Sequence, residues 1–229
     1  MAAIVSSSTM ILLLFVGLLA MPCSRAEYFC GIHNACYMTP DGCSYGNCDF
    51  EVVWSQQENT TKYDFKIAVR TTGWAAFGIS SDKFMGDDDV YMCIVEGDGA
   101  KFEHRFNFGR SNIAGTGTGV LSTERRYVNG VVSCRIERDL SVTNNGVTVD
   151  LTTDWYMFFA KGPIQSGSPL QHDKIPRITK VKVDFSELPV LTPGDLDYPN
   201  TNDNGATAQR AGFLLIMCST ILLLMGVHM

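Results

Sequence analysis

Apolar and polar side chains alternate along several stretches in the middle of this chain. In Lys62–Arg70 every second residue is apolar, from Tyr63 to Val69, and the residues between them are mostly charged. Lys180–Phe185 repeats the pattern, so Val181 is expected to face a protein core. A period of two residues is typical of a strand with one buried face. The pattern therefore predicts a β-sheet.

Seven further stretches have the composition of strands. They are Phe50–Trp54, Gly73–Ile79, Val90–Val95, Lys101–Phe108, Tyr127–Ile136, Val147–Leu151 and Trp155–Ala160. Asn-Gly pairs at 129–130 and 145–146 predict tight turns, and no stretch between the two ends of the chain shows a helical period. Many short strands with such turns favour an all-β fold, an immunoglobulin-like antiparallel β-sandwich, which we expect over residues 50–186.

Both ends of the chain are apolar. The run Met10–Met21, followed by small residues at positions 24 and 26, predicts a secretory signal peptide over residues 1–26. Phe213–Val227 is a second apolar run, preceded by small residues from Asn204 and a polar spacer. This pattern predicts attachment of a GPI anchor at Asn204, with a transmembrane helix over residues 212–229 as the alternative.

Either anchor places the domain in the secretory pathway, at the outer face of the plasma membrane or the lumenal face of the ER membrane. Residues 187–211 hold several Pro, Asn and Asp residues and are expected to form a stalk. The formal net charge of −6 argues against a nucleic-acid partner, which requires a basic patch. The sequon at Asn59 predicts a glycosylated surface turn.

Six cysteines remain when the signal and the C-terminal run are set aside. They are Cys30, Cys36, Cys43, Cys48, Cys93 and Cys134. An even number in a secreted domain predicts up to three disulfides, and their pairing stays open. The first four lie in a Cys-rich N-terminal segment, residues 27–49, where a zinc site is the alternative. Their spacing lacks the paired C-x-x-C clips of zinc sites, which favours disulfides.

The chain lacks the motifs of hydrolases, kinases and covalently bound haem, so no catalytic residue is expected. His104 shares its parity with neighbouring phenylalanines, which favours a core histidine hydrogen-bonded to the backbone. His172 and Met85 both fall in loops, where binding residues tend to lie. The run Asp87–Asp89 could bind calcium, but its spacing favours a solvated turn before the next strand.

Two segments resemble the DOMON domain family. Gly73–Cys93 reads G-W-A-A-F-G-I-S-S-D-K-F-M-G-D-D-D-V-Y-M-C, and Asp154–Pro163 reads D-W-Y-M-F-F-A-K-G-P and is followed by Q-H-D. DOMON domains are extracytoplasmic β-sandwiches, and many hold a b-type haem between a methionine and a histidine. The resemblance implies that Met85 and His172 bind the haem iron and that the domain carries single electrons to a redox partner. Six nearby aromatic residues either line the haem slot or belong to the core: Trp74, Phe77, Phe84, Trp155, Phe158 and Phe159.

The order of parts resembles one group within this family. A Cys-rich segment, one DOMON domain and a terminal apolar run, without a cytochrome b561 unit, are similar to members that assist the assembly of AMPA-type glutamate receptors. This resemblance implies the alternative function: a non-catalytic accessory protein that binds a membrane partner and regulates synaptic receptor levels. Neither function makes the chain an enzyme on its own.

Overall fold

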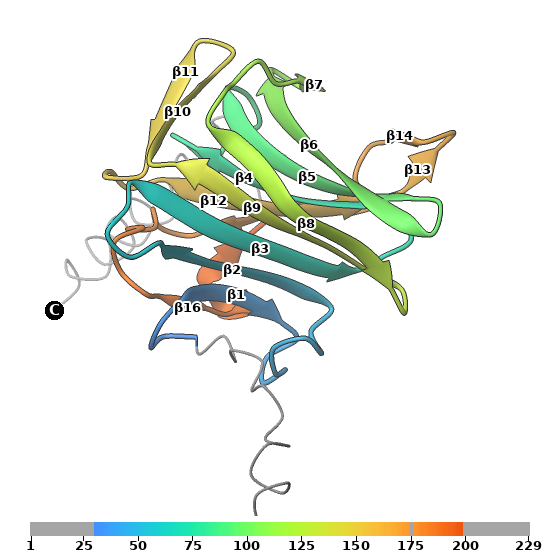
Figure 1. Cartoon of the computed structure of the whole chain (residues 1–229), viewed down its shortest axis with the longest axis horizontal. Coiled ribbons are helices and arrows are strands. Elements are labelled where there is room, and N and C mark those ends of the chain that lie inside the picture. The colour runs from blue at the N-terminus through green and yellow to red at the C-terminus, as the bar shows by residue number, and fades with distance from the viewer. Residues whose placement is uncertain (1–29, 175, 199–229) are drawn as a thin grey trace, which may run out of the picture.

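The computed structural model describes residues 30–174 and 176–198. Two β-sheets lie face to face, joined by hairpins and short turns (Figure 1). The described residues contain no α-helix, and their one helical element is a 3-10 turn, η1, at Pro193–Asp195. None of the described helical structure is long and apolar enough to cross a membrane. The expected signal peptide, the anchor and Asn204 lie outside the described residues. The prediction of an all-β sandwich is confirmed.

The first sheet has six strands in the spatial order β16-β1-β2-β3-β9-β8. In chain order they are β1 (Ala35–Thr39), β2 (Phe50–Gln56), β3 (Lys62–Arg70), β8 (Val120–Val128), β9 (Val131–Asp139) and β16 (Val190–Leu191). The second sheet has seven strands in the order β17-β15-β12-β4-β5-β6-β7. They are β4 (Trp74–Ser80), β5 (Asp88–Glu96), β6 (Gly99–Phe108), β7 (Ser111–Ala114), β12 (Tyr156–Gly162), β15 (Arg177–Thr179) and β17 (Leu196–Asp197).

Two hairpins stand apart from these sheets. They pair β10 (Ser141–Asn144) with β11 (Val147–Asp150) and β13 (Ile164–Gln165) with β14 (Ser168–Pro169). The Asn-Gly turns are confirmed, because Asn129 and Asn145 have φ values of 52° and 50° and each precedes a glycine of positive φ. Such values suit the turns that join tight hairpins. The first of these turns divides the expected strand Tyr127–Ile136 between β8 and β9.

The hydrophobic core lies between the two sheets. The alternation in β3 buries Phe65, whose ring stacks on Phe77 from β4, with 5.1 Å between centroids. Phe77 in turn stacks on Tyr91 from β5 at 4.8 Å. A disulfide between Cys93 and Cys134 joins β5 to β9, so the two sheets are also linked covalently.

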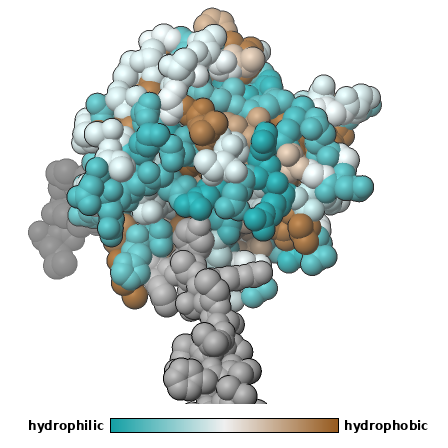
Figure 2. Space-filling view, viewed as in Figure 1, coloured by the Kyte–Doolittle hydropathy of each residue, from teal (hydrophilic) through white to brown (hydrophobic). Residues whose placement is uncertain are grey.

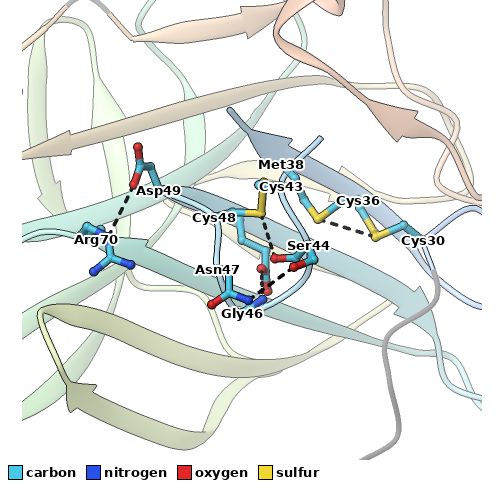
Figure 3. Close-up of a disulfide and its surroundings, with 11 residues drawn as sticks. Cys30, Cys36, Met38, Cys43, Ser44, Gly46, Asn47, Cys48, Asp49 and Arg70 are labelled. Atoms are coloured by element: carbon cyan, nitrogen blue, oxygen red, sulfur yellow. Dashed lines mark hydrogen bonds and ion pairs between the residues drawn. A yellow bond between two sulfur atoms is a disulfide. The ribbon is translucent and has the colours of Figure 1, made fainter. Parts of the chain in front are cut away.

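The Cys-rich segment belongs to the sandwich rather than preceding it. It contributes β1, which pairs with β2, and disulfides join Cys30 to Cys36 and Cys43 to Cys48. Figure 3 shows these two disulfides beside the strands of the six-stranded sheet. All six expected cysteines are paired, which excludes the zinc alternative.

Two sequence expectations near the C-terminal end of the domain are wrong. Residues 190–197 were expected in the stalk, but β16 pairs with β1 in parallel and β17 pairs with β15, and Leu196 is buried in the core. Lys180–Phe185 is not a regular strand: only Val183 forms an isolated bridge, with Trp155, and Val181 is 72% exposed.

Candidate functional site

Met85 lies in the turn that connects β4 to β5. Side-chain and backbone hydrogen bonds shape this turn: Phe84 N donates to Asp82 Oδ1 at 2.8 Å, and Asp87 N donates to Asn107 O at 2.7 Å. The side chain of Met85 is 41% exposed, so the methionine does not fill the core.

The three aspartates after Met85 differ from the expected solvated turn. Only Asp87 is exposed, whereas Asp88 and Asp89 begin β5 and are buried. Asp88 Oδ2 accepts hydrogen bonds from Gly86 N at 3.0 Å and Asn107 Nδ2 at 2.9 Å, and burial raises the pKa of Asp88. Across the described chain, no three His, Cys, Asp or Glu side chains are placed to hold a metal ion, so calcium has no support here.

His104 is a core histidine, as expected, but its partners are side chains. Its Nε2 lies 2.5 Å from Asp89 Oδ1 and 3.1 Å from Asn144 Nδ2, and its ring stacks on Tyr91. Burial tends to raise the pKa of Asp89, but the hydrogen bond and charge of His104, with the hydroxyl of Tyr91, outweigh burial and lower it. A carboxylate held in this way stabilises the fold and does not face a ligand.

Asn144 is the part of this network that sequence reasoning missed. Besides Asp89, its Nδ2 donates to Arg105 O at 2.9 Å, while its Oδ1 accepts from Thr116 N at 2.9 Å and Gly117 N at 3.2 Å. The sequence indicated only a turn at this position, because none of these partners is local.

His172 lies in the segment that follows β14, and it is half-buried. Two contacts hold the segment against the seven-stranded sheet: Trp74 Nε1 donates to Leu170 O at 2.9 Å, and Asp173 N donates to Lys161 O at 3.2 Å. Trp74 can lie there because Gly162 has no side chain, since a Cβ at that position would be 2.8 Å from the indole ring.

The face of the seven-stranded sheet that points away from the core carries an apolar strip. It consists of Trp74, Ala76, Val90, Met92 and Ile94, with Ala160 and Ile164 packed against them. Phe77 and Phe159 point the other way and belong to the core, and Phe84 is 63% exposed. Trp155 packs against the core. Phe158 lies between the core residues Met157 and Phe159 and so points to the outer face, which leaves Trp74 and Phe158 as the two aromatic candidates on the face that carries the strip.

Met85 and His172 lie beyond opposite ends of this strip. Ser80, which precedes the Met85 turn, is opposite Tyr156, whereas Lys161, which contacts the His172 segment, is opposite Ala75. Five residues separate these two rows, or about 17 Å along a strand. Ligation of one iron by both side chains thus requires the two loops to close inward over the strip.

The apolar strip and the side chains of Met85 and His172 are of the chemical types that bind haem. A porphyrin is apolar like the strip, but Trp74, Ala76, Val90, Met92 and Ile94 are at most 6% exposed, so a haem reaches them only if the segments that cover the strip move away. A thioether and an imidazole are established axial donors to haem iron. The residues fit the group in type, and their ligand role stays a prediction.

Comparison with known proteins places the chain in a family. The model of the DOMON domain matches residues 46–162, a range that includes Met85 and ends before His172. The chain belongs to the DOMON domain family. The human DOMON domain-containing protein FRRS1L is 33% identical over 146 residues, which are 63% of this chain and 49% of that protein. Mouse ferric-chelate reductase 1 is 28% identical over 189 residues, 82% of this chain and 32% of that protein.

The DOMON chain spans about half, or less, of the length of these two relatives. Among solved structures, the cytochrome domain of Myriococcum thermophilum cellobiose dehydrogenase is similar, with a TM-score of 0.49 and 10% identity over 60% of this chain and 76% of that one. The cytochrome b domain of pyranose dehydrogenase from Coprinopsis cinerea gives 0.45 and 10% over 63% and 88%.

Proposed function

We propose that this DOMON domain is tethered to the outer face of a membrane and carries single electrons with a b-type haem held by Met85 and His172. The observation that supports the proposal is the apolar strip, beyond whose two ends lie a loop with a methionine and a loop with a histidine. When bound, a haem with thioether and imidazole ligands supplies reversible one-electron exchange and leaves no open coordination site for a substrate. The domain is then a carrier and not an enzyme by itself.

The chain's own residues have separate tasks in this proposal. The strip excludes water from one side of the group, while Trp74 fixes the His172 segment through its hydrogen bond to Leu170 O. Hydrogen bonds to Asp82 and Asn107 hold the Met85 turn on either side of the methionine.

The test is a titration of the purified full chain with haem, followed by an absorption spectrum of the dithionite-reduced protein. Sharp α and β bands are expected from the wild type, and they should be lost in Met85→Ala and in His172→Ala. Met38→Leu and His33→Ala, which change the same residue types in the Cys-rich segment, should keep them. If the wild-type protein is well folded but shows no such bands after addition of haem, the proposal is wrong.

A second candidate function is the accessory role implied by the family resemblance. Two observations favour it: the 17 Å estimate between the ends of the strip and the similarity to FRRS1L. In this case the domain binds a membrane partner, such as an AMPA-type glutamate receptor, without haem. Co-purification with receptor subunits at a fixed stoichiometry, unchanged by His172→Ala, is the expected result, and absence of the complex rejects this role.

The type of anchor has its own test. Either the chain is cleaved after Asn204, and GPI replaces residues 205–229, or residues 212–229 stay as a transmembrane segment. A phospholipase that cleaves GPI should release the domain from intact cells in the first case and leave it bound in the second.

A further inference from the structure

One end of the seven-stranded sheet exposes large apolar side chains beside lysines. This exit-end surface, as we name it, consists of Phe84, Met85, Phe108 and Val181, together with Lys83 and Lys182. Phe84, Phe108 and Val181 are 63%, 66% and 72% exposed. Single exposed apolar residues are common on proteins, but a contiguous group of them marks an interaction site.

The members of the exit-end surface are neighbours across several strands. Lys83 and Lys182 both place Nζ over the ring of Tyr156, at 5.5 and 5.7 Å from its centroid. At the other side, a Cβ on Gly86 would lie 3.5 Å from Gly109, which puts the Met85 turn against the turn that follows Phe108. The surface therefore forms a band from the start of β12 to the end of β6.

The Phe84–Met85 turn is held in shape without help from its apolar side chains. Asp82 accepts the Phe84 amide, and Gly86 N donates to Asp88 Oδ2 at 3.0 Å. The turn thus presents two apolar side chains on a fixed backbone. A surface prepared in this way loses little conformational freedom on binding.

The chain leaves the described domain at the same surface. Asp197 Oδ2 lies 3.4 Å from Lys83 Nζ, and the ring of Tyr198 lies against the guanidinium of Arg177 at 3.9 Å. Fourteen residues, 199–212 (212 − 198), then separate Tyr198 from the apolar run Phe213–Val227. Fourteen residues reach at most about 50 Å when fully extended, so an anchored run keeps this end of the domain close to the bilayer.

We infer that the exit-end surface rests on the lipid surface of the membrane that anchors the chain. This inference depends on the anchoring part of the proposed function and concerns the haem-free chain, because Met85 cannot face lipid and bind the haem iron at the same time. The apolar side chains enter the boundary between headgroups and acyl chains, while Lys83 and Lys182 reach lipid phosphates with their charged ends. Tyr156 and Tyr198 take the interfacial position that tyrosine favours.

The charges on the exit-end surface determine which lipid suits an experiment on membrane binding. Asp82 and Asp87 are exposed in the same turn as Lys83, so the two signs are mixed. Apolar insertion rather than attraction to anionic lipid then dominates, and a phosphatidylcholine bilayer is sufficient.

The experiment uses the full chain, free of haem, in phosphatidylcholine nanodiscs. Hydrogen peroxide oxidises exposed methionines, and peptide mass spectrometry gives the rate at Met85. The comparison is with Phe84→Ser/Phe108→Ser, which removes the two exposed rings. The control is Val128→Ser, because this side chain is 59% exposed and lies at the opposite end of the sandwich, next to Val131.

We expect Met85 in the wild type and in the control to oxidise at least about fivefold more slowly than in Phe84→Ser/Phe108→Ser, since methionine oxidation follows exposure. Equal rates in wild type and Phe84→Ser/Phe108→Ser, in chains that co-purify with the nanodiscs, overturn the inference. A chain that does not co-purify with the nanodiscs overturns both the anchoring and this inference.

Discussion

Glu51 is a carboxylate on β2 that lies on the outer face of the six-stranded sheet beneath the loop between Cys43 and Cys48. Its Oε2 accepts a hydrogen bond from Gly46 N at 2.8 Å, and among the described residues its Oε1 has no hydrogen-bond partner. The residue is 1% exposed. Burial raises the pKa of Glu51 from 4.5 to about 6, against the opposing effect of the Gly46 amide.

This raised pKa sets the size and direction of a pH effect on stability. A difference of about 1.5 pH units at about 1.4 kcal/mol per unit corresponds to about 2 kcal/mol. Because the folded protein holds the Glu51 proton more tightly than the unfolded chain, the stabilising contribution is complete below the ordinary pKa. It is lost as the pH rises from 4.5 through about 6.

Glu51→Gln tests this effect through urea unfolding of the full chain at several pH values. At each pH the free energy of unfolding of the wild type is subtracted from that of the variant. The contributions of all other titrating groups are common to both proteins and cancel in this difference. This difference should increase by about 2 kcal/mol in favour of the variant between about pH 4 and pH 7, whatever its constant offset.

A control with the opposite sign is Asp150→Asn. Hydrogen bonds from the Thr152 amide and hydroxyl, at 2.9 and 2.8 Å, lower the pKa of Asp150. The stabilising contribution of the Asp150 carboxylate is therefore present at neutral pH and lost in acid. As the pH rises, the free energy of unfolding of Asp150→Asn should decrease relative to that of the wild type. A flat difference for Glu51→Gln would refute the reasoning about burial.

Three other predictions concern covalent links and polar contacts. Cys93→Ala/Cys134→Ala removes a disulfide between residues that are 41 positions apart. It should lower the free energy of unfolding by about 4 kcal/mol, and the lost packing of the buried sulfur atoms lowers it further. Cys43→Ala/Cys48→Ala, with a separation of 5 residues, should lose only about 2 kcal/mol, and equal losses in denaturant titrations would contradict this loop-length argument. Asn144→Leu removes one of several hydrogen bonds to Asp89 and leaves the amide of Gly117 without its partner, whereas the amide of Thr116 keeps Asn145 Oδ1. We expect a loss of about 1–3 kcal/mol and faster amide exchange at Gly117; unchanged exchange would reject this role. Asn59 is exposed in the turn between β2 and β3, and Asn59→Gln should abolish a gel shift on glycosidase treatment of protein secreted by eukaryotic cells, whereas a shift that persists would place the glycan elsewhere.

The sequence predicted the strands whose two faces differ in polarity. Lys62–Arg70 has the expected bounds, because alternation depends only on the side chains of one strand. The two-residue strands β16 and β17 could not be predicted, since they exist through pairing with β1 and β15 and carry no pattern of their own. The burial of Asp88 and Asp89 was missed for a related reason: their hydrogen-bond partners are distant in the chain.

The candidate site was predicted only as a list of residues. Loop positions of Met85 and His172 follow from local composition and family resemblance, but their separation follows from the antiparallel order of β4 and β12. Cysteine pairing was likewise open, because counting cysteines does not determine which side chains meet. Interpreting Val181 as buried failed because alternation extends past the point where β15 ends.

The late position of β16 and β17 in the chain has a consequence for biosynthesis. Each completes one side of a sheet, and both are encoded after every other strand of the domain. Until translation has passed residue 197, β1 and β15 of a nascent chain therefore each have one edge without a neighbouring strand. Unpaired strand edges can pair with other chains and cause aggregation. A message truncated after Phe185 should yield a product retained by chaperones, even though it encodes nearly the whole domain.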